Sequence, residues 1–470
     1  MDVFSLPFLF FFLPVTGLVF CLVPRRFRVF VLFVASAFFY AMTSPVGLGI
    51  MAVSVGIDFL LARPIFLCGK GSRWGKAAVT VGAAKNILLF VTLSSISQLD
   101  LMEMPLGVTV YCFTSLGYLV DLYNGETDPI TSFYDYGLFC CFFGKLYVGP
   151  IISANQFRGQ LGTLRPSLSL MGQGFIWLCH GLAKKVILAD GVLALGTQFK
   201  DIPYQEKTVF GVWLLVICHL LATYYTLSGF SDMARGVGAL FGMELPENFH
   251  YPLQADSVTD FFSRFNISAN RFVRKYVYGA LSAEDNGKLS TTLNILLITI
   301  LMGLWYGINI NYLAWGGVLG FFIVLETLYG EKVLHRLPSL VRWLYTFVAV
   351  VFSFAIYSSG SISQALFYLK TMVGLGTSRL WDNQVLYLLT SNWLLLVLCV
   401  DQTRPQCVRL YLRRAAHPAH TRSLRRHDAG LGRREKTAAV VFSDHSGHRP
   451  QFHLLGSASE GAGHPRRAQA

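Results

Sequence analysis

The sequence predicts an all-α, polytopic integral membrane protein, and three observations support this fold class. Hydrophobic residues make up 53% of the 470-residue chain and charged residues only 14%, whereas soluble domains average about 25% charged residues. Apolar runs of about 20 residues, long enough to cross a bilayer as a helix, recur along the chain. The net positive charge that could indicate a nucleic-acid ligand lies mainly after residue 401. These features exclude a soluble multidomain enzyme, and we expect no nucleic-acid partner.

The first four apolar runs predict the topology. They cover residues 4–23, 28–42, 46–62 and 78–97. The loops after the first and third runs are basic, with Arg25, Arg26, Arg28, Arg63, Lys70, Arg73 and Lys76. The loops 43–45 and 98–104 carry no basic residue. Because cytoplasmic loops are enriched in Lys and Arg, we expect a multi-pass protein of the plasma membrane with its N-terminus outside.

Further apolar runs continue the predicted membrane region. They lie near residues 105–123, 133–152, 171–195, 208–228, 289–306, 310–329, 343–359 and 384–400. With the first four they predict about 10–12 transmembrane helices. The stretch from Ser228 to Leu281 is both polar and aromatic, and it is too polar to face lipid. We therefore expect re-entrant and interfacial helices around a central cavity.

The composition changes abruptly near residue 400. Residues 402–470 hold twelve Arg and one Lys against four acidic residues, with no apolar face. Two interpretations stay open: a basic cytoplasmic tail that binds anionic lipid, or the product of a frame slip that replaces further membrane helix. The expected domains are N-terminal transmembrane helices over 1–104, a membrane-embedded core over 105–400, and a disordered tail or frame-slip product over 401–470.

Several segments in the core carry a family resemblance. They are PLGVTVYCFTSLGYLVDLYNGE (Pro105 to Glu126), GKLYVGPI (Gly144 to Ile151), GLAKKVILAD (Gly181 to Asp190), Tyr224 to Pro252, Ser257 to Tyr278, and MGLWYGININYLAWGG (Met302 to Gly317). In this order they resemble the membrane-bound O-acyltransferase family, in the bacterial branch of the alginate O-acetylation and teichoic-acid D-alanylation proteins. The core over 105–400 would then be acyltransferase-like.

The resemblance implies a function as well as a fold. Helices would surround a tunnel, which a thioester donor, acyl-CoA or an acyl-carrier thioester, enters from the cytoplasm. The acyl group, expected to be acetyl, would move towards a hydroxyl of an extracytoplasmic cell-surface polysaccharide. An extracytoplasmic partner protein with a hydrolase-like fold could complete the transfer. No bound cofactor or metal is implied, and the nine Cys form no CxxC pair.

Two positions depart from the family pattern, and both are catalytic candidates. The resemblance implies an essential His in a Leu-Trp-His-Gly segment, where this chain has Tyr306. A second His of that branch, in a Trp-His-Ile-Ser context, is Asn266 here. Tyr has a reference pKa near 10 against about 6.5 for His, and burial raises it further. Tyr306 can donate a hydrogen bond to a developing oxyanion, but it is a poor base.

Three interpretations of Tyr306 follow. It is a hydrogen-bond donor in an active enzyme whose base lies elsewhere, with His219 or His250 as the candidates. Alternatively, it marks a catalytically inactive relative that serves as a scaffold or acyl-export channel for a partner transferase. Otherwise it is one more packed aromatic residue beside Trp305.

The remaining candidates are residues for binding substrate or lining the cavity: Asp232, Arg235, Arg264, Trp305 and His250. Asp232 lies in an apolar setting, where a carboxylate needs a partner, and Arg235 follows on the same side of a helix. Both structural pairing and a direct role in acyl transfer are open for Asp232. Likewise, Lys184 and Lys185 are either cytoplasmic anchors or contacts for a phosphate-bearing donor.

Overall fold

The computed structural model describes residues 3–99, 101–161, 164, 167–278, 288–375 and 379–403, and the regular elements among them are helices. The N-terminal helices are α1 (Leu13–Leu22), α2 (Arg28–Thr43), α3 (Pro45–Cys68), α4 (Arg73–Gln98), α5 (Val108–Asn124), α6 (Phe133–Cys141) and α7 (Ala154–Leu161). The central ones are α8 (Leu168–Ala183), α9 (Asp190–Asp201), α10 (Val209–Leu240), α11 (Val258–Arg264) and α12 (Ile267–Val273). The last are α14 (Lys288–Leu304), α15 (Ile310–Val333), α16 (Ser339–Tyr357), α17 (Ile362–Met372), α18 (Asn383–Ser391) and α19 (Trp393–Gln402). The predicted all-α fold class is confirmed.

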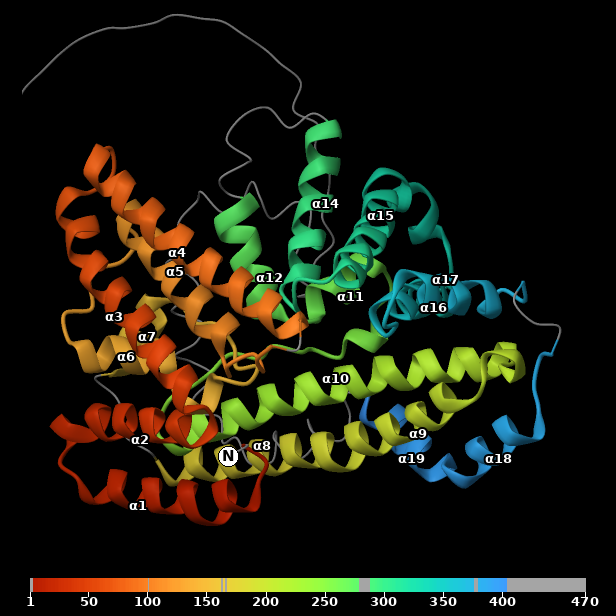
Figure 1. The fold of residues 1–470 in the computed structure, drawn as a ribbon, viewed down its shortest axis with the longest axis horizontal. Coiled ribbons are helices and arrows are strands. Elements are labelled where there is room, and N and C mark those ends of the chain that lie inside the picture. The colour runs from red at the N-terminus through yellow and green to blue at the C-terminus, as the bar shows by residue number, and fades with distance from the viewer. Residues whose placement is uncertain are drawn as a thin grey trace, which may run out of the picture. The chain divides into compact units, whose positions relative to one another are not determined.

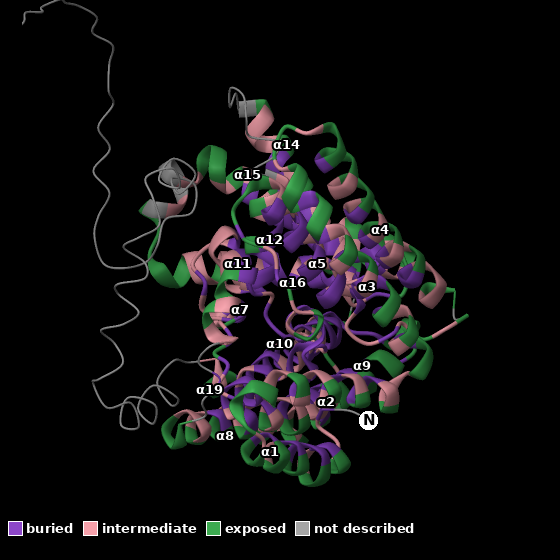
Figure 2. Ribbon diagram, turned by 90° about the vertical axis from the view of Figure 1, so that its left-hand side faces the viewer, coloured by how far each residue is buried: buried purple, intermediate pink, exposed green. Residues whose placement is uncertain are grey.

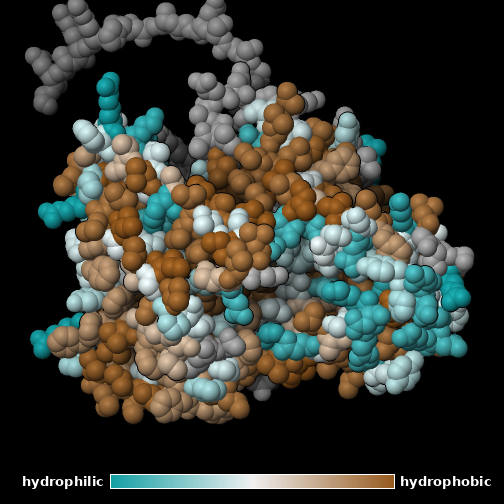
Figure 3. Space-filling model, viewed as in Figure 1, coloured by the Kyte–Doolittle hydropathy of each residue, from teal (hydrophilic) through white to brown (hydrophobic). Residues whose placement is uncertain are grey.

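Six helices within the described part of the chain are long and apolar enough to span a membrane, or seven if the bent pair α18–α19 is one span. This is fewer than the 10–12 predicted. Two apolar runs form shorter helices, Phe8–Leu22 and Leu289–Leu304, whereas a straight span needs about 20 residues. Many large hydrophobic side chains are exposed, and they cover much of the face in Figure 3, as expected of a surface in contact with lipid. The chain is a multi-pass membrane protein.

The described residues, 3 to 403 with the gaps given above, belong to one compact unit. The proposed boundary near residue 104 stays a prediction, and the tail from 404 onwards lies outside the described residues. Buried residues concentrate along α10 and α5, while α1 exposes most of its side chains (Figure 2). The polar stretch after Ser228 begins as the end of α10 and continues as a loop with the short helices α11 and α12.

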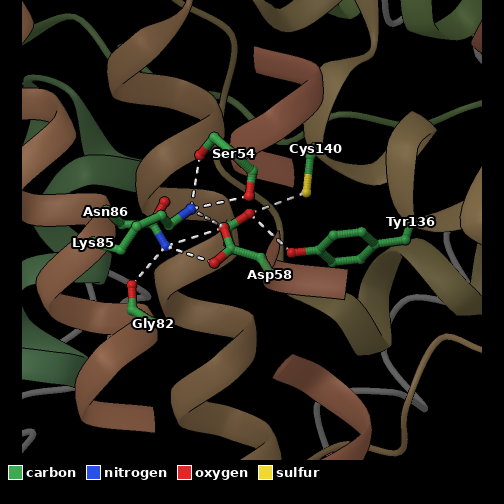
Figure 4. Close-up of polar contacts among 8 residues, drawn as sticks. Ser54, Asp58, Gly82, Lys85, Asn86, Tyr136 and Cys140 are labelled. Carbon is green, nitrogen blue, oxygen red and sulfur yellow. Dashed lines mark hydrogen bonds and ion pairs between the residues drawn. The ribbon is translucent and has the colours of Figure 1, made fainter. Parts of the chain in front are cut away.

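A buried polar network joins the N-terminal spans α3 and α4. Asp58 on α3 is fully buried, and its Oδ2 lies 2.7 Å from Lys85 Nζ of α4. Lys85 also donates to Ser54 Oγ at 2.7 Å, and Asn86 Nδ2 donates to both Asp58 oxygens. Figure 4 shows these side chains pointing at one another between the helices. A buried charge between two apolar helices destabilises the protein unless it has such partners. The network therefore fixes how α3 and α4 pair.

Helix α10 crosses the middle of this unit with α8 alongside (Figure 1). Glycines bring the two backbones close together. A Cβ on Gly181 would lie 2.5 Å from the Gly229 carbonyl oxygen, and one on Gly236 would lie 2.7 Å from that of Gly174. The glycines are spaced seven apart on each helix, and small residues at an interface are typical of close packing between membrane helices. This packing positions the polar side chains of α8 and α10 that are described below.

Candidate functional site

Tyr306 lies in a tight turn between α14 and α15. Gly307 in this turn has φ 144°, and Asn309 caps α15 by accepting the Asn311 N–H. The two helices pack closely, because a Cβ on Gly303 would lie 2.2 Å from the Tyr312 carbonyl oxygen. The turn therefore holds Tyr306 at a defined position beside the α11–α12 segment.

Asn266 forms the junction between α11 and α12, and its backbone has φ 55°. Asn is among the residues that tolerate this left-handed conformation best. An isolated bridge between Phe249 and Phe265 brings the preceding loop alongside, so that Asn248 lies next to Asn266. The structure thus joins Tyr306 and Asn266, 40 residues apart in the sequence, at one place.

A chain of hydrogen bonds runs through these residues in one direction. The Ser268 backbone N–H donates to Asn248 Oδ1 at 2.7 Å, so the amide nitrogen of Asn248 faces Asn266. Asn248 Nδ2 donates to Asn266 Oδ1 at 3.0 Å, and Asn266 Nδ2 donates to the Tyr306 hydroxyl at 3.2 Å. Because a backbone N–H can only donate, it fixes the polarity of the whole chain. The Tyr306 hydroxyl accepts here and keeps its own proton for another acceptor.

Aromatic rings surround the half-buried Tyr306 side chain. The Trp315 and Tyr357 rings meet it edge-on, with centroids 5.7 and 6.0 Å away. Burial raises the pKa of Tyr306 above its usual value, so the hydroxyl stays protonated at neutral pH. A neutral phenol held by a fixed donor can stabilise a developing oxyanion. The neighbouring Trp305 points elsewhere and stacks on Phe113 of α5 at 4.5 Å.

Asp232 and Arg235 lie in a second polar group, the α8–α10 cluster, which comprises Trp177, His180, Lys184, Ser228, Asp232 and Arg235. Lys184 Nζ is 2.7 Å from Asp232 Oδ2 and donates to Ser228 Oγ at 2.9 Å. His180 Nδ1 lies 3.2 Å from the same Oδ2. Arg235 Nη1 is 3.8 Å from Oδ1, so the predicted pairing along the helix is present. Asp232 therefore has the partners that a buried carboxylate needs.

The cluster includes two residues that the sequence reasoning missed, His180 and Trp177. The Arg235 guanidinium lies over the Trp177 ring, 3.9 Å from its centroid. His180 precedes Lys184 by four residues in an apolar run, a spacing that puts both on one face of a helix. That spacing was the available signal. Lys185 is apart from the cluster and pairs with Asp190.

The other candidates are not in contact with Tyr306. Arg264 pairs with Asp260 on its own helix at 2.8 Å. His250 is 43% exposed and faces Glu247 at 3.4 Å, although its backbone N–H bonds to the Arg264 carbonyl beside the Asn248–Asn266 pair. His219 Nδ1 bonds to the Leu215 carbonyl within α10. Among the residues that the structure describes, no three His, Cys, Asp or Glu side chains come together as metal ligands would.

Comparison with known proteins places this arrangement in a family. The model of the membrane-bound O-acyltransferase family matches residues 126–369, which include Asn266, Tyr306 and the α8–α10 cluster. A "probable alginate O-acetylase" of Pseudomonas fluorescens is 29% identical over 362 residues, 76% of this chain and 72% of that protein. A peptidoglycan O-acetyltransferase of Helicobacter pylori is 26% identical over 391 residues, 73% of each chain. A teichoic acid D-alanyltransferase of Bacillus subtilis is 24% identical over 266 residues, 53% of this chain and 65% of that protein. With more than half of its length matched, the chain belongs to the membrane-bound O-acyltransferase family.

Proposed function

We propose that the protein is an O-acyltransferase that moves an acetyl group from a cytoplasmic thioester towards a hydroxyl of a cell-envelope polysaccharide. Acyl-CoA or an acyl-carrier thioester is the donor, and the protein lies in the plasma membrane with its N-terminus outside. Its relatives named as acetylases of alginate and of peptidoglycan support the acyl group and the class of acceptor. An extracytoplasmic partner protein could receive the acyl group before the polymer does.

The observation that carries the proposal is the hydrogen-bond chain that ends at Tyr306. The Tyr306 hydroxyl is partly buried among aromatic rings and has one proton to donate. The side-chain amides of Asn248 and Asn266 hold this hydroxyl in place, and the Ser268 backbone N–H fixes which way both amides point. In the reaction, the acceptor oxygen attacks the thioester carbonyl carbon, and the C–S bond breaks. Negative charge develops on the carbonyl oxygen during the attack, and a donor placed there lowers the barrier. The acceptor's proton leaves with the thiol, so atoms and charge balance.

The test is transfer of labelled acetyl from a thioester by purified protein in liposomes, comparing wild type with Tyr306→Phe and Tyr306→His. Phe keeps the ring and removes only the donor, so we expect kcat to fall by about 10²–10³, the loss found when one oxyanion donor is removed. Full activity in Tyr306→Phe would refute the donor role. An inert wild type that Tyr306→His activates would instead support the alternative, a catalytically inactive scaffold or acyl-export channel.

A further inference from the structure

The α8–α10 cluster carries more positive charge than its one carboxylate balances. Lys184 and Arg235 face Asp232, so the group has a net charge of +1 before any charge on His180. The side chains of Lys184, Arg235 and Asp232 are only 12, 19 and 9% exposed. An excess charge held away from water is unfavourable unless a counter-ion offsets it. An anion bound here would offset the excess positive charge of the cluster.

Two nitrogen atoms in the cluster also lack a hydrogen-bond partner. Arg235 Nη1 and His180 Nε2 are both buried, and neither has a hydrogen-bond partner among the residues that the structure describes. Because His180 Nδ1 donates to Asp232, its Nε2 can donate to an anion only from the protonated ring. Buried polar atoms are normally satisfied by protein, water or ligand. Arg235 is held in place by its stacking on Trp177, and His180 by its contact with Asp232. Both side chains are therefore oriented before any ligand arrives.

The backbone at Lys184 is unusual as well. Residues Lys184–Ala189 form a π-helical turn between α8 and α9. Such turns are rare and occur frequently at functional sites. The turn directs Lys184 towards Ser228 and Asp232 of α10, while the next residue, Lys185, pairs with Asp190. The two lysines of the GLAKK segment thus have different surroundings.

The cluster lies between the two ends of the first apolar run. Phe230, two residues before Asp232, contacts Phe4, and Lys185 lies over the same ring, at the end of the run that we expect to be outside. The Phe241 ring, at the end of α10, contacts Phe20 at 5.2 Å, and Arg28 of the first basic loop lies over Phe20. Arg235 is six residues before Phe241, about 9 Å along the helix axis. Arg235 thus lies on the Phe241 side of the cluster, the side that faces the first basic loop.

The spacing along α10 suits a long, flexible donor. Thr223 bonds to Tyr357, whose ring contacts Tyr306. Arg235 lies twelve residues beyond Thr223, about 18 Å along the helix axis. In a pantetheine thioester, thirteen bonds separate the phosphorus from the sulfur, so an extended arm spans about 15 Å at the usual rise of an extended chain. A phosphate at the cluster would let the thioester approach the level of Tyr306.

We propose that the α8–α10 cluster binds the phosphate ester of the acyl donor, with Arg235, Lys184 and His180 as its ligands and Trp177 as the support for Arg235. Arg and Lys are the side chains that recognise phosphate best, Arg through paired N–H donors. This inference rests on the proposed function, since it assigns a part of the donor. The same chemistry would suit a lipid headgroup phosphate, which is the other source to be tested.

The first experiment measures binding without turnover. Coenzyme A is titrated into full-length protein in phosphatidylcholine nanodiscs. We expect binding to wild type that weakens with salt, and a Kd at least tenfold higher in Arg235→Gln, as for loss of one charge-assisted hydrogen bond. Arg26→Gln is the matched control, because it removes an exposed charge from the first basic loop without touching the cluster. Equal Kd values for wild type and Arg235→Gln, or an equal loss in Arg26→Gln, would overturn the proposal.

The second experiment uses a donor without a phosphate. With S-acetyl-N-acetylcysteamine as the donor, Arg235→Gln should transfer acetyl as fast as wild type, whereas its KM for acetyl-CoA should rise at least tenfold. Arg235→Lys, which keeps the charge, should restore part of the affinity if Arg235→Gln folds poorly. Equal losses with both donors would mean that Arg235 is structural, and that result would overturn the proposal.

A third comparison separates the two sources of phosphate. If phosphatidylglycerol in the nanodisc displaces coenzyme A and stabilises wild type but not Arg235→Gln, the site belongs to a lipid headgroup and the donor assignment is wrong. Failure of the proposed function looks different. An inert protein that still binds coenzyme A through Arg235 would support this site while refuting catalysis at Tyr306.

Discussion

Replacing Asn266 tests whether it acts through Tyr306. Asn266→Gly keeps the left-handed backbone at φ 55° and removes the side chain that donates to Tyr306. The buried Asn248 Nδ2 then loses its acceptor, which should cost about 1–3 kcal/mol of stability. Asn266→Ala should cost about 1–2 kcal/mol more, because Ala is strained in this conformation. Thermal unfolding of both variants in detergent separates the backbone effect from the side-chain effect.

The activity of the double variant decides the mechanism. If Asn266 only orients the Tyr306 hydroxyl, Asn266→Gly lowers kcat in wild type but has no further effect in a Tyr306→Phe background, where there is no hydroxyl to orient. The rate of acetyl transfer in liposomes is measured for all four proteins: wild type, the two single variants and the double variant. Losses that multiply would show that Asn266 contacts the substrate directly, and the reasoning from the hydrogen-bond chain would fail.

Three further changes test the fold around the site. Lys85→Leu removes the counter-ion of the buried Asp58, which keeps its hydrogen bonds from Asn86, and should destabilise the protein by about 3–5 kcal/mol. Lys85→Leu with Asp58→Leu should recover most of this loss in thermal unfolding, and no recovery would contradict the pairing. Gly181→Ala forces α8 away from α10 and should cost about 1–3 kcal/mol, while Gly172→Ala, which faces open space on the same helix, should cost nothing. Burial lowers the pKa of Lys145 to about 8 in the folded protein, so above that pH the unfolded chain binds more protons than the folded one. The free energy of unfolding should therefore rise from about pH 8 to about pH 10. Lys145→Met should remove this part of the rise.

The N-terminal helices could be predicted because basic residues and Pro separate their apolar runs. The run at 28–42 became α2, from Arg28 to Thr43, and the run at 46–62 became most of α3. The count of spans could not be predicted in the same way, since hydropathy does not distinguish burial in lipid from burial in protein. The run at 133–152 shows the reason: α6 stops at Cys141, and Gly149 then packs so closely on Lys145 that a Cβ would lie 2.2 Å from its Cα.

The same distinction applies to the site: contacts within one helix could be predicted from the sequence, whereas contacts between elements could not. Spacing along one helix predicted that Arg235 faces Asp232, and it could equally have predicted that His180 shares a face with Lys184. The meeting of residues from different elements needed the structure. Asp232 and His180 are 52 residues apart and meet only because glycines let α8 and α10 approach. Tyr306 and Asn266 were linked in advance only through the family resemblance.

The hydrogen-bond chain limits what Tyr306 can do. Because the Ser268 N–H fixes both amides, Asn266 presents an N–H to the hydroxyl and offers it no acceptor. Among the residues that the structure describes, no base therefore takes the proton of the phenol, and burial already disfavours the phenolate. None of the histidines whose side chains the structure describes contacts it. In the reaction that we propose for this place, Tyr306 stabilises the oxyanion as a donor, and the leaving thiolate takes the acceptor's proton. This division of roles explains how a Tyr could stand where the family resemblance implies a His without ending the chemistry.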